Sequence, residues 1–232
     1  MSDTSYNQFC PVSMAAEVIC SRWTLLVLRE LVLGSRRFNE LRRGLPSMSP
    51  ALLSKRLKDL EAAGIVMHVA AGREPGALEY RLTEAGNELR PVIEAIGVWG
   101  HRWVTTEATL QNLDANLLMW DIRRNINANP MPPRRNTVQF IFNDRPTSER
   151  NFWLIVEPGN EADLCLIDPG FDVDLYVSTD LRTMTEIWLG YMAISRAAEN
   201  GRLVLTGDSK LAGDLRSWLK LSVFAKLEKK VA

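Results

Sequence analysis

The spacing of leucines between Ser49 and Gly64 (SPALLSKRLKDLEAAG) predicts one amphipathic helix. At about 100° per residue, the leucines fall on one side of it: Leu52, Leu53, Leu57 and Leu60. Ser49 is a typical N-cap residue, Pro50 suits the first helical position because no N–H is needed there, and Gly64 suits the residue after the helix. The opposite side presents small and basic residues: Ala51, Ser54, Lys55 and Lys58.

The pattern on both sides of this helix predicts a winged helix-turn-helix. Helical spacing precedes it in three segments: Ser13–Ile19, Arg22–Gly34, and two turns that carry Phe38, Leu41 and Leu45. After Gly64, the runs IVMHVAA and LEYRLT have strand patterns and are separated by GREPGA, which predicts a hairpin. Thr83–Val104 follows with helical spacing and a predicted bend near Pro91. This order of helices and hairpin is that of a winged helix.

Beyond the polar segment Thr105–Asn116, which we interpret as a domain boundary, the pattern changes. LLMWDIRRNINANP predicts a helix that Pro130 ends, and four strand-like runs follow: NTVQFIFND, ERNFWLIVEPG, ADLCLIDPG and DVDLYVSTD. DLRTMTEIWLGYMAISRAAENG has helical spacing, RLVLTGD is a further strand, and SKLAGDLRSWLKLSVFAKL predicts a closing helix. Strands followed by helices predict an α+β fold, with a first domain over residues 1–106 and a second over 115–228.

Composition excludes several classes of function but says little more about the fold. At 232 residues and 46% hydrophobic content the chain can bury a substantial core, and no run approaches the ~20 apolar residues of a membrane-spanning helix. The N-terminus lacks the pattern of a secretory signal, so we expect a cytoplasmic protein with no membrane partner. Three cysteines without CxxC spacing and two histidines leave little material for a metal site, a cofactor or a catalytic centre. We therefore expect no enzyme activity.

The formal net charge is zero, but the charges are unevenly distributed along the chain. Nine basic and two acidic residues between Arg22 and Lys58 give this segment a net charge of +7, while acidic residues gather elsewhere. Phosphate contacts depend on local charge, so the segment that holds the predicted helix-turn-helix suits nucleic acid.

The polar face of the Ser49–Gly64 helix is therefore predicted to contact DNA in the major groove. Ala51 permits close approach to a thymine methyl group, while serine and lysine side chains can reach base edges and phosphates. The residues expected to contact DNA are Arg36, Arg37, Ser47, Ser49, Ala51, Ser54, Lys55, Lys58 and, at the hairpin tip, Arg73. Arg56 points toward the edge of the apolar side, so we expect it in a buried ion pair instead of at a base. A solvated helix face without a partner is the alternative, which the basic segment and the hairpin disfavour.

The segment Cys10–Val104 resembles the HxlR-type family of bacterial winged-helix transcriptional regulators through its combination of CPV, RWT, RRFNELRR and LTEAG. The resemblance implies a homodimer that binds double-stranded DNA at a palindromic operator, with Ser13–Ile19 and Thr83–Val104 as dimer helices. The sequence departs from the family pattern in the wing, where Ala77 replaces a basic residue and leaves Arg73 as the wing contact.

Residues 115–226 resemble the sterol-carrier-type lipid-binding fold, in which strand, helix, helix, GxLxLxGD strand and helix surround an apolar tunnel. The resemblance implies a sheet of about five strands backed by helices, and a small hydrophobic ligand. The residues expected to line its site are Trp120, Phe140, Phe142, Trp153, Ile155, Leu166, Leu175, Trp188, Tyr191 and Met192. The alternative for each is ordinary core packing, because a cavity and a core use the same residue types.

The leading hypothesis is a DNA-binding transcriptional regulator whose second domain binds a small apolar effector. One alternative is a thiol-based sensor of oxidants or electrophiles at Cys10, which the HxlR resemblance permits; Cys10 can equally be a packing residue beside Pro11. Another alternative is a lipid carrier with vestigial DNA binding, or an enzyme. The carboxylate-rich segment GNEADLCLIDPGFDVDLY has no histidine or nucleophile nearby, so we expect turn residues there.

Overall fold

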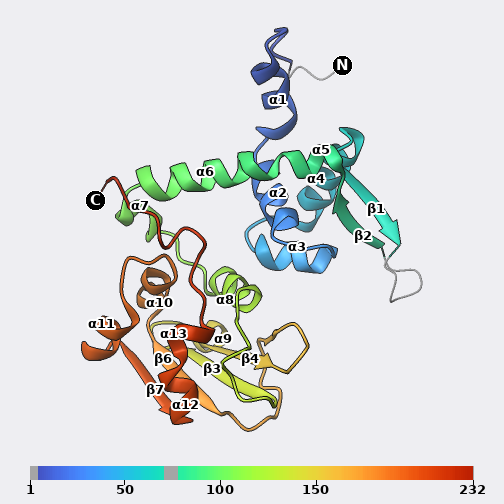
Figure 1. The fold of residues 1–232 in the computed structure, drawn as a ribbon. Coiled ribbons are helices and arrows are strands. Elements are labelled where there is room, and N and C mark those ends of the chain that lie inside the picture. Colours follow the sequence, from blue (N-terminus) through green and yellow to red (C-terminus); the bar gives the residue numbers. More distant parts are fainter. Residues whose placement is uncertain (1–4, 71–77, 232) are drawn as a thin grey trace. The chain divides into compact units, whose positions relative to one another are not determined.

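The computed structural model describes residues 5–70 and 78–231, which form two compact units (Figure 1). The first unit is Met1–Gly97 and the second is Val98–Ala232, so the boundary falls inside helix α6 (Arg90–Trp103). Each unit has its own hydrophobic core. The domain ranges expected from the sequence, 1–106 and 115–228, are not tested by this division and remain predictions.

The first unit combines helices with a two-stranded hairpin. Its elements are α1 (Pro11–Ile19), α2 (Thr24–Val32), α3 (Phe38–Gly44), α4 (Pro50–Ala62), β1 (Val66–Ala70), β2 (Leu78–Leu82), α5 (Glu84–Glu88) and the first part of α6. The strands pair antiparallel, with Val66 opposite Leu82 and Ala70 opposite Leu78, so the predicted hairpin is confirmed. Its tip, residues 71–77, lies outside the described residues, and with it the predicted wing contact Arg73.

The predicted helix over Thr83–Val104 is divided into α5 and α6, which separate at Leu89. Pro91 causes the break because it has no N–H to donate, and it occupies the first turn of α6, where none is needed. Thr83 caps α5 by accepting a hydrogen bond of 3.1 Å from the backbone N–H of Gly86. The sequence thus located the irregularity correctly as a bend near Pro91, and the structure shows it as a division into two helices.

Helix α1 has no buried residue, and its apolar side chains Val12 and Met14 are 76% and 58% exposed. In α6, Trp99 and Trp103 are 63% and 52% exposed. Both helices therefore present large apolar side chains to solvent. Within the described ranges no single helix has the length and apolarity to cross a membrane; α1 and α2 meet that test only as a pair, bent by 83°.

The second unit is built around one mixed sheet. Its elements after α6 are α7 (Thr106–Thr109), α8 (Ala115–Arg124), β3 (Asn136–Phe142), α9 (Thr147–Arg150), β4 (Asn151–Val156), β5 (Asp163–Cys165), β6 (Leu175–Thr179), α10 (Leu181–Trp188), α11 (Ile194–Glu199), β7 (Leu203–Gly207), α12 (Ser209–Gly213) and α13 (Leu215–Trp218). The strand order is β5-β4-β3-β6-β7, parallel between β3 and β6 and antiparallel elsewhere. The predicted α+β class and five-stranded sheet are confirmed, and the sterol-carrier likeness stays a prediction.

One face of this sheet carries the core of the second unit. Alternate strand residues such as Phe140, Phe142 and Leu154 are fully buried there, because successive side chains of a strand point to opposite faces. Helices α8, α10, α12 and α13 contribute buried residues to the same cluster. The unit therefore has helices packed on one side of a twisted sheet, as an α+β domain requires.

The predicted closing helix, SKLAGDLRSWLKLSVFAKL, is wrong in its length. The structure has two short helices, α12 and α13, and residues 219–231 form an irregular tail. Besides local turns, the tail backbone bonds to distant partners: the Ser222 N–H donates to the Trp188 carbonyl at 3.0 Å, and the Lys230 N–H donates to the Arg102 carbonyl at 2.9 Å. These tertiary hydrogen bonds replace the helical ones that the local spacing favoured.

Candidate nucleic-acid interface

Helix α4 separates a buried leucine side from an exposed polar side. The buried side consists of three residues that are at most 1% exposed: Leu53, Leu57 and Leu60. Burying a leucine side chain stabilises a fold by about 1.5–3 kcal/mol, so this side is fixed toward α2 and β1. The outward side consists of the predicted groove residues, among which Ser54 is partly buried: Ala51, Ser54, Lys55 and Lys58.

The lysines of α4 differ from its arginine in what they contact. Lys55 and Lys58 are exposed and make no ion pair within the described ranges. Arg56 donates to the Arg22 carbonyl at 3.0 Å and to a carboxylate oxygen of Asp59 at 2.8 Å, and its side chain is 18% exposed. The predicted ion pair of Arg56 is confirmed, but it is not buried, because the Asp59 side chain is 51% exposed.

The start of α4 is formed as its sequence predicted. The Ser49 hydroxyl accepts a hydrogen bond of 3.3 Å from the Leu52 N–H, and Pro50 occupies the first helical position. Ser47, two residues earlier, is exposed in the turn between α3 and α4. The Ser49 hydroxyl therefore accepts a cap hydrogen bond, whereas the exposed Ser47 hydroxyl is not used to cap α4.

The start of α3 is joined to the wing strand. The backbone N–H groups of Arg36 and Arg37 donate to one carboxylate oxygen of Glu40 at 2.7 and 3.0 Å. The Arg36 carbonyl accepts a hydrogen bond of 2.8 Å from the Tyr80 N–H of β2. The Arg36 side chain is exposed, while Arg37 is partly buried. These bonds fix α3 and the base of the wing to each other in the first unit.

A buried carboxylate links the end of α2 to the end of α3. Glu30 is fully buried and pairs with Arg29 at 2.7 Å, while the Ser35 hydroxyl donates to it at 3.1 Å. Arg29 also donates to the Gly44 carbonyl at 2.9 Å. Sequence reasoning counted Arg29 among the basic residues of the segment and missed this role. The adjacent Arg29 and Glu30 were the only signal. Because Glu30 is already counted against Arg29, the pair leaves the segment's net charge at +7 but removes one of its nine basic side chains from those that could face DNA.

Residues 18–108 match the family described as HxlR-like helix-turn-helix. Among curated relatives, the HTH-type transcriptional regulator YvaP of Bacillus subtilis is 35% identical over 42% of this chain and 92% of its own length. The chain belongs to the HxlR-like family. The HTH-type transcriptional regulator sll1512 of Synechocystis is 36% identical over 44% of this chain and 76% of its own. The solved reduced form of the transcriptional regulator YodB from B. subtilis is 31% identical over 42% of this chain and 96% of that chain, with a TM-score of 0.37.

Membership in the HxlR-like family makes the chain a transcriptional regulator and agrees with the expectation that it is not an enzyme. The HxlR-like match contains α2, α3, α4 and the hairpin, and it ends at residue 108. The sheet of the second unit lies beyond it, so the comparison says nothing of what that sheet binds.

The ten residues expected to line an apolar ligand site are placed in several different environments. Four belong to the continuous core of the second unit: Phe140, Phe142, Leu175 and Trp188. Three are buried outside that cluster: Trp120, Trp153 and Ile155. Leu166 is 58% exposed, whereas Tyr191 and Met192 line a cavity. The structure does not bring the ten together, because Trp153 and Ile155 alternate along β4 with residues of the core face.

Cys10, the candidate thiol sensor, is the N-cap residue of α1 and is partly buried. Hydrogen bonds from the backbone N–H groups of Ser13 and Val12 hold the pKa of the Cys10 thiol below its ordinary value, because they stabilise the thiolate. A lowered pKa increases the fraction of reactive thiolate at neutral pH.

Proposed function

We propose that this HxlR-like protein is a homodimeric transcriptional regulator that reads double-stranded DNA with α4 and responds to a small effector bound by its second unit. The observation that carries the proposal is the division of α4 into a leucine side fixed in the core and a polar side that presents Lys55 and Lys58. A helix with small and basic residues on its outward side suits a major groove.

Residues next to α4 in the first unit supply further proposed contacts to DNA. Ser47 and Ser49 stand at the N-terminal end of α4, where a DNA phosphate would meet backbone N–H groups and the positive end of the helix dipole. Arg36 is exposed at the start of α3 and can reach the DNA backbone, as can Arg37 from its partly buried position. Arg73 remains the proposed minor-groove contact of the wing.

The exposed apolar side chains of α1 and α6 support the homodimer. Val12 and Met14 on α1, and Ile96, Trp99 and Trp103 on α6, are all more than 45% exposed. A second copy of the chain that covers these side chains would remove them from water, and a two-fold dimer would match a palindromic operator. Light scattering on the purified protein tests the dimer: a monomer at micromolar concentration would reject it.

Gel-shift titration against the DNA upstream of its own gene tests the reading surface. Lys55→Gln and Lys58→Gln are each expected to weaken binding and to reduce the slope of log affinity against log salt by about 1. Lys220→Gln, an exposed lysine of the second unit, is the matched control and should leave both quantities unchanged. Salt-insensitive binding, or wild-type binding by the double variant, would refute the role of α4.

The cavity lined by Tyr191 and Met192 supports an effector role for the second unit, because a site of about 550 Å³ is in the range of small-molecule sites. An effector changes DNA affinity only if it binds the DNA-bound and free states unequally. Gel shifts with and without an apolar extract test the coupling, and an operator affinity that no bound molecule alters would reject it.

Thiol sensing at Cys10 is a second candidate function, supported by the lowered pKa of this thiol at the start of α1. Oxidation or alkylation there would place a larger or cross-linked group beside a helix that we propose to lie in the dimer. Gel shifts with diamide test it in the wild type and in Cys10→Ser, with Cys165→Ser as the control. An equal diamide response in wild type and Cys10→Ser would exclude Cys10 as the sensor.

A further inference from the structure

A cavity of about 550 Å³ in the second unit has walls from three separate parts of the chain. His101 comes from the end of α6, Glu186 and Tyr191 from α10 and the turn after it, and Arg196 from α11. The irregular C-terminal tail closes another side with Lys229. The cavity thus combines charged groups with apolar and aromatic walls, unlike the apolar site that the sequence predicted.

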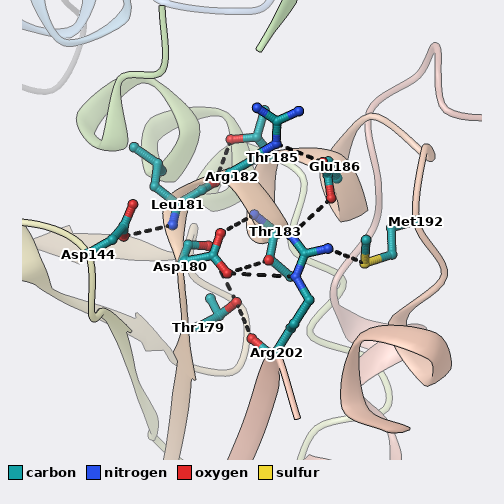
Figure 2. Close-up of polar contacts among 10 residues, drawn as sticks. All are labelled: Asp144, Thr179, Asp180, Leu181, Arg182, Thr183, Thr185, Glu186, Met192 and Arg202. Atoms are coloured by element: carbon teal, nitrogen blue, oxygen red, sulfur yellow. Dashed lines mark hydrogen bonds and ion pairs between the residues drawn. The ribbon is translucent and has the colours of Figure 1, made fainter. Parts of the chain in front are cut away.

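Glu186 and Arg202, which line one side of the cavity, belong to a network of hydrogen bonds and ion pairs (Figure 2). The two oxygens of Glu186 accept from Arg182 at 3.2 Å and from Arg202 at 3.3 Å. Arg202 also lies 3.9 Å from Asp180 and donates to the Met192 sulfur at 3.8 Å. Because Glu186 is engaged by two guanidinium groups, it cannot neutralise a third cation of the cavity.

Two further cations line the cavity without a carboxylate partner in the parts of the chain that the structure describes. Lys229 Nζ donates to three neutral oxygens: the His101 carbonyl at 3.2 Å, the Val104 carbonyl at 2.6 Å and the Tyr191 hydroxyl at 3.1 Å. Arg196 is exposed at the rim. Neutral acceptors satisfy hydrogen bonds but do not balance charge, so the cavity keeps an excess of positive charge.

The pKa of His101 reflects the same environment. Burial holds it below the ordinary histidine value, and the positive charges of Lys229 and Arg102 add to the effect. His101 is therefore mainly neutral near pH 7, so the excess positive charge of the cavity does not come from this side chain. Its Nε2 atom lies 3.2 Å from the Leu227 carbonyl, which ties the tail to the end of α6.

The apolar part of the cavity is closely packed at the turn after α10. Leu189, Met192 and Leu227 line it together with the Tyr191 ring, over which the Lys229 ammonium lies 4.8 Å from the ring centre. Gly190 adopts a φ of +79°, and a Cβ atom there would overlap the backbone of Ala225. The tail is therefore packed closely against the turn after α10.

We propose that this cavity binds a small organic carboxylate, whose charge lies between Arg196, Arg202 and Lys229 and whose apolar body packs against Tyr191 and Met192. Arginine is well suited to the task because its planar fork binds a carboxylate through two parallel hydrogen bonds. The inference rests on the proposed effector role of the second unit and gives that effector its chemical class. It replaces a purely apolar ligand by an amphipathic anion.

Isothermal titration calorimetry of the full chain, without DNA, tests the site with sodium octanoate. We expect saturable binding of octanoate, no binding of the uncharged analogue 1-octanol at equal concentration, and a dissociation constant raised about tenfold or more by Arg196→Gln. Arg196 is exposed and has no ion pair in the described parts, so its replacement leaves the fold intact. Arg216→Gln, an exposed arginine on α13 outside the cavity lining, is the matched control with wild-type affinity.

Each other outcome overturns the inference. Equal binding of octanol and octanoate would show an apolar site, and preferential binding of inorganic phosphate would show a different anion class. Octanoate binding that Arg196→Gln leaves unchanged, or no binding by the folded chain, would refute this cavity as the site. Gel shifts run separately distinguish the two proposals. Octanoate that binds without altering DNA affinity would refute the effector role. DNA binding by a protein that does not bind octanoate would refute only carboxylate binding in this cavity.

Discussion

Gly44 lies directly against the buried carboxylate of Glu30, so that a Cβ atom on residue 44 would occupy the position of the carboxylate oxygens. Arg29 bonds to both residues, to the Glu30 side chain and to the Gly44 carbonyl. A glycine at the end of α3 thus permits a charged group to be buried and satisfied between α2 and α3. This contact sets how α3, and the turn that leads to α4, are held on the core.

Gly44→Ala is expected to destabilise the first unit by about 2 kcal/mol or more, because the methyl group displaces a buried, hydrogen-bonded carboxylate. Urea unfolding followed by circular dichroism measures the change. Gly100→Ala is the control: nothing lies within 4 Å of its added Cβ, so it should be neutral or slightly stabilising within α6. Equal stability of Gly44→Ala and wild type would contradict the contact.

Ser49→Ala is expected to cost about 1 kcal/mol of stability, because the Leu52 N–H then loses its cap acceptor. Ser47→Ala should leave stability unchanged, since Ser47 is exposed and caps no helix. Thermal unfolding separates the two variants. If both serines contact DNA, both variants should weaken DNA binding in a gel shift. An equal loss of stability in the two variants would contradict the assignment of the cap to Ser49 alone.

Protein stability should fall as the pH is lowered through the range in which His101 titrates. The folded chain holds the pKa of His101 below the ordinary value of about 6.5, so the unfolded chain takes up the proton first and is favoured. We expect the loss to begin near pH 7, to reach at most about 1.4 kcal/mol per pH unit, and to end below the folded pKa. Urea unfolding at several pH values measures it.

His101→Gln should remove this part of the pH dependence, because glutamine does not titrate. His68→Gln on the hairpin, where the side chain is exposed beside Glu61, serves as the matched histidine control and should retain the His101 contribution. A wild-type profile that His101→Gln leaves unaltered between pH 7 and 5 would show that other groups cause the loss.

The Cys10 thiol should react with iodoacetamide at a lower pH in the folded chain than in urea. The N–H groups of Ser13 and Val12 stabilise the thiolate only while α1 is formed, so the midpoint of the rate profile should lie below the ordinary cysteine pKa of about 8.5. Replacement of Cys20 and Cys165 by serine isolates the signal. Identical midpoints in buffer and urea would argue against the hydrogen bonds at this thiol.

How much the sequence could predict depended on whether the deciding interactions were local. Helix α4 was predicted closely because Ser49, Pro50 and the leucine spacing act within one helix. The closing helix failed because the Ser222 N–H bonds to the Trp188 carbonyl, a partner that no local pattern reveals. The same limit explains Arg29, whose charge faces its neighbour Glu30 rather than solvent.

The residues of the candidate ligand site were predicted only in part, for a related reason. Large apolar residues such as Phe140 and Phe142 are common to a core and to an apolar tunnel, so residue type could not separate the two. The cations of the observed cavity, Arg196, Arg202 and Lys229, are separated by up to a few dozen residues and one of them is in the tail. Their convergence depends on the packing of the tail, which sequence spacing did not predict.

Leu227 and Lys229 belong to a stretch without helix or strand, and this has a practical consequence. Cleavage of the backbone between residues 219 and 226 would detach one wall and one charge of the cavity while sparing every residue of α4. If both proposals hold, protein clipped in this way during purification would still bind DNA but would no longer respond to the effector.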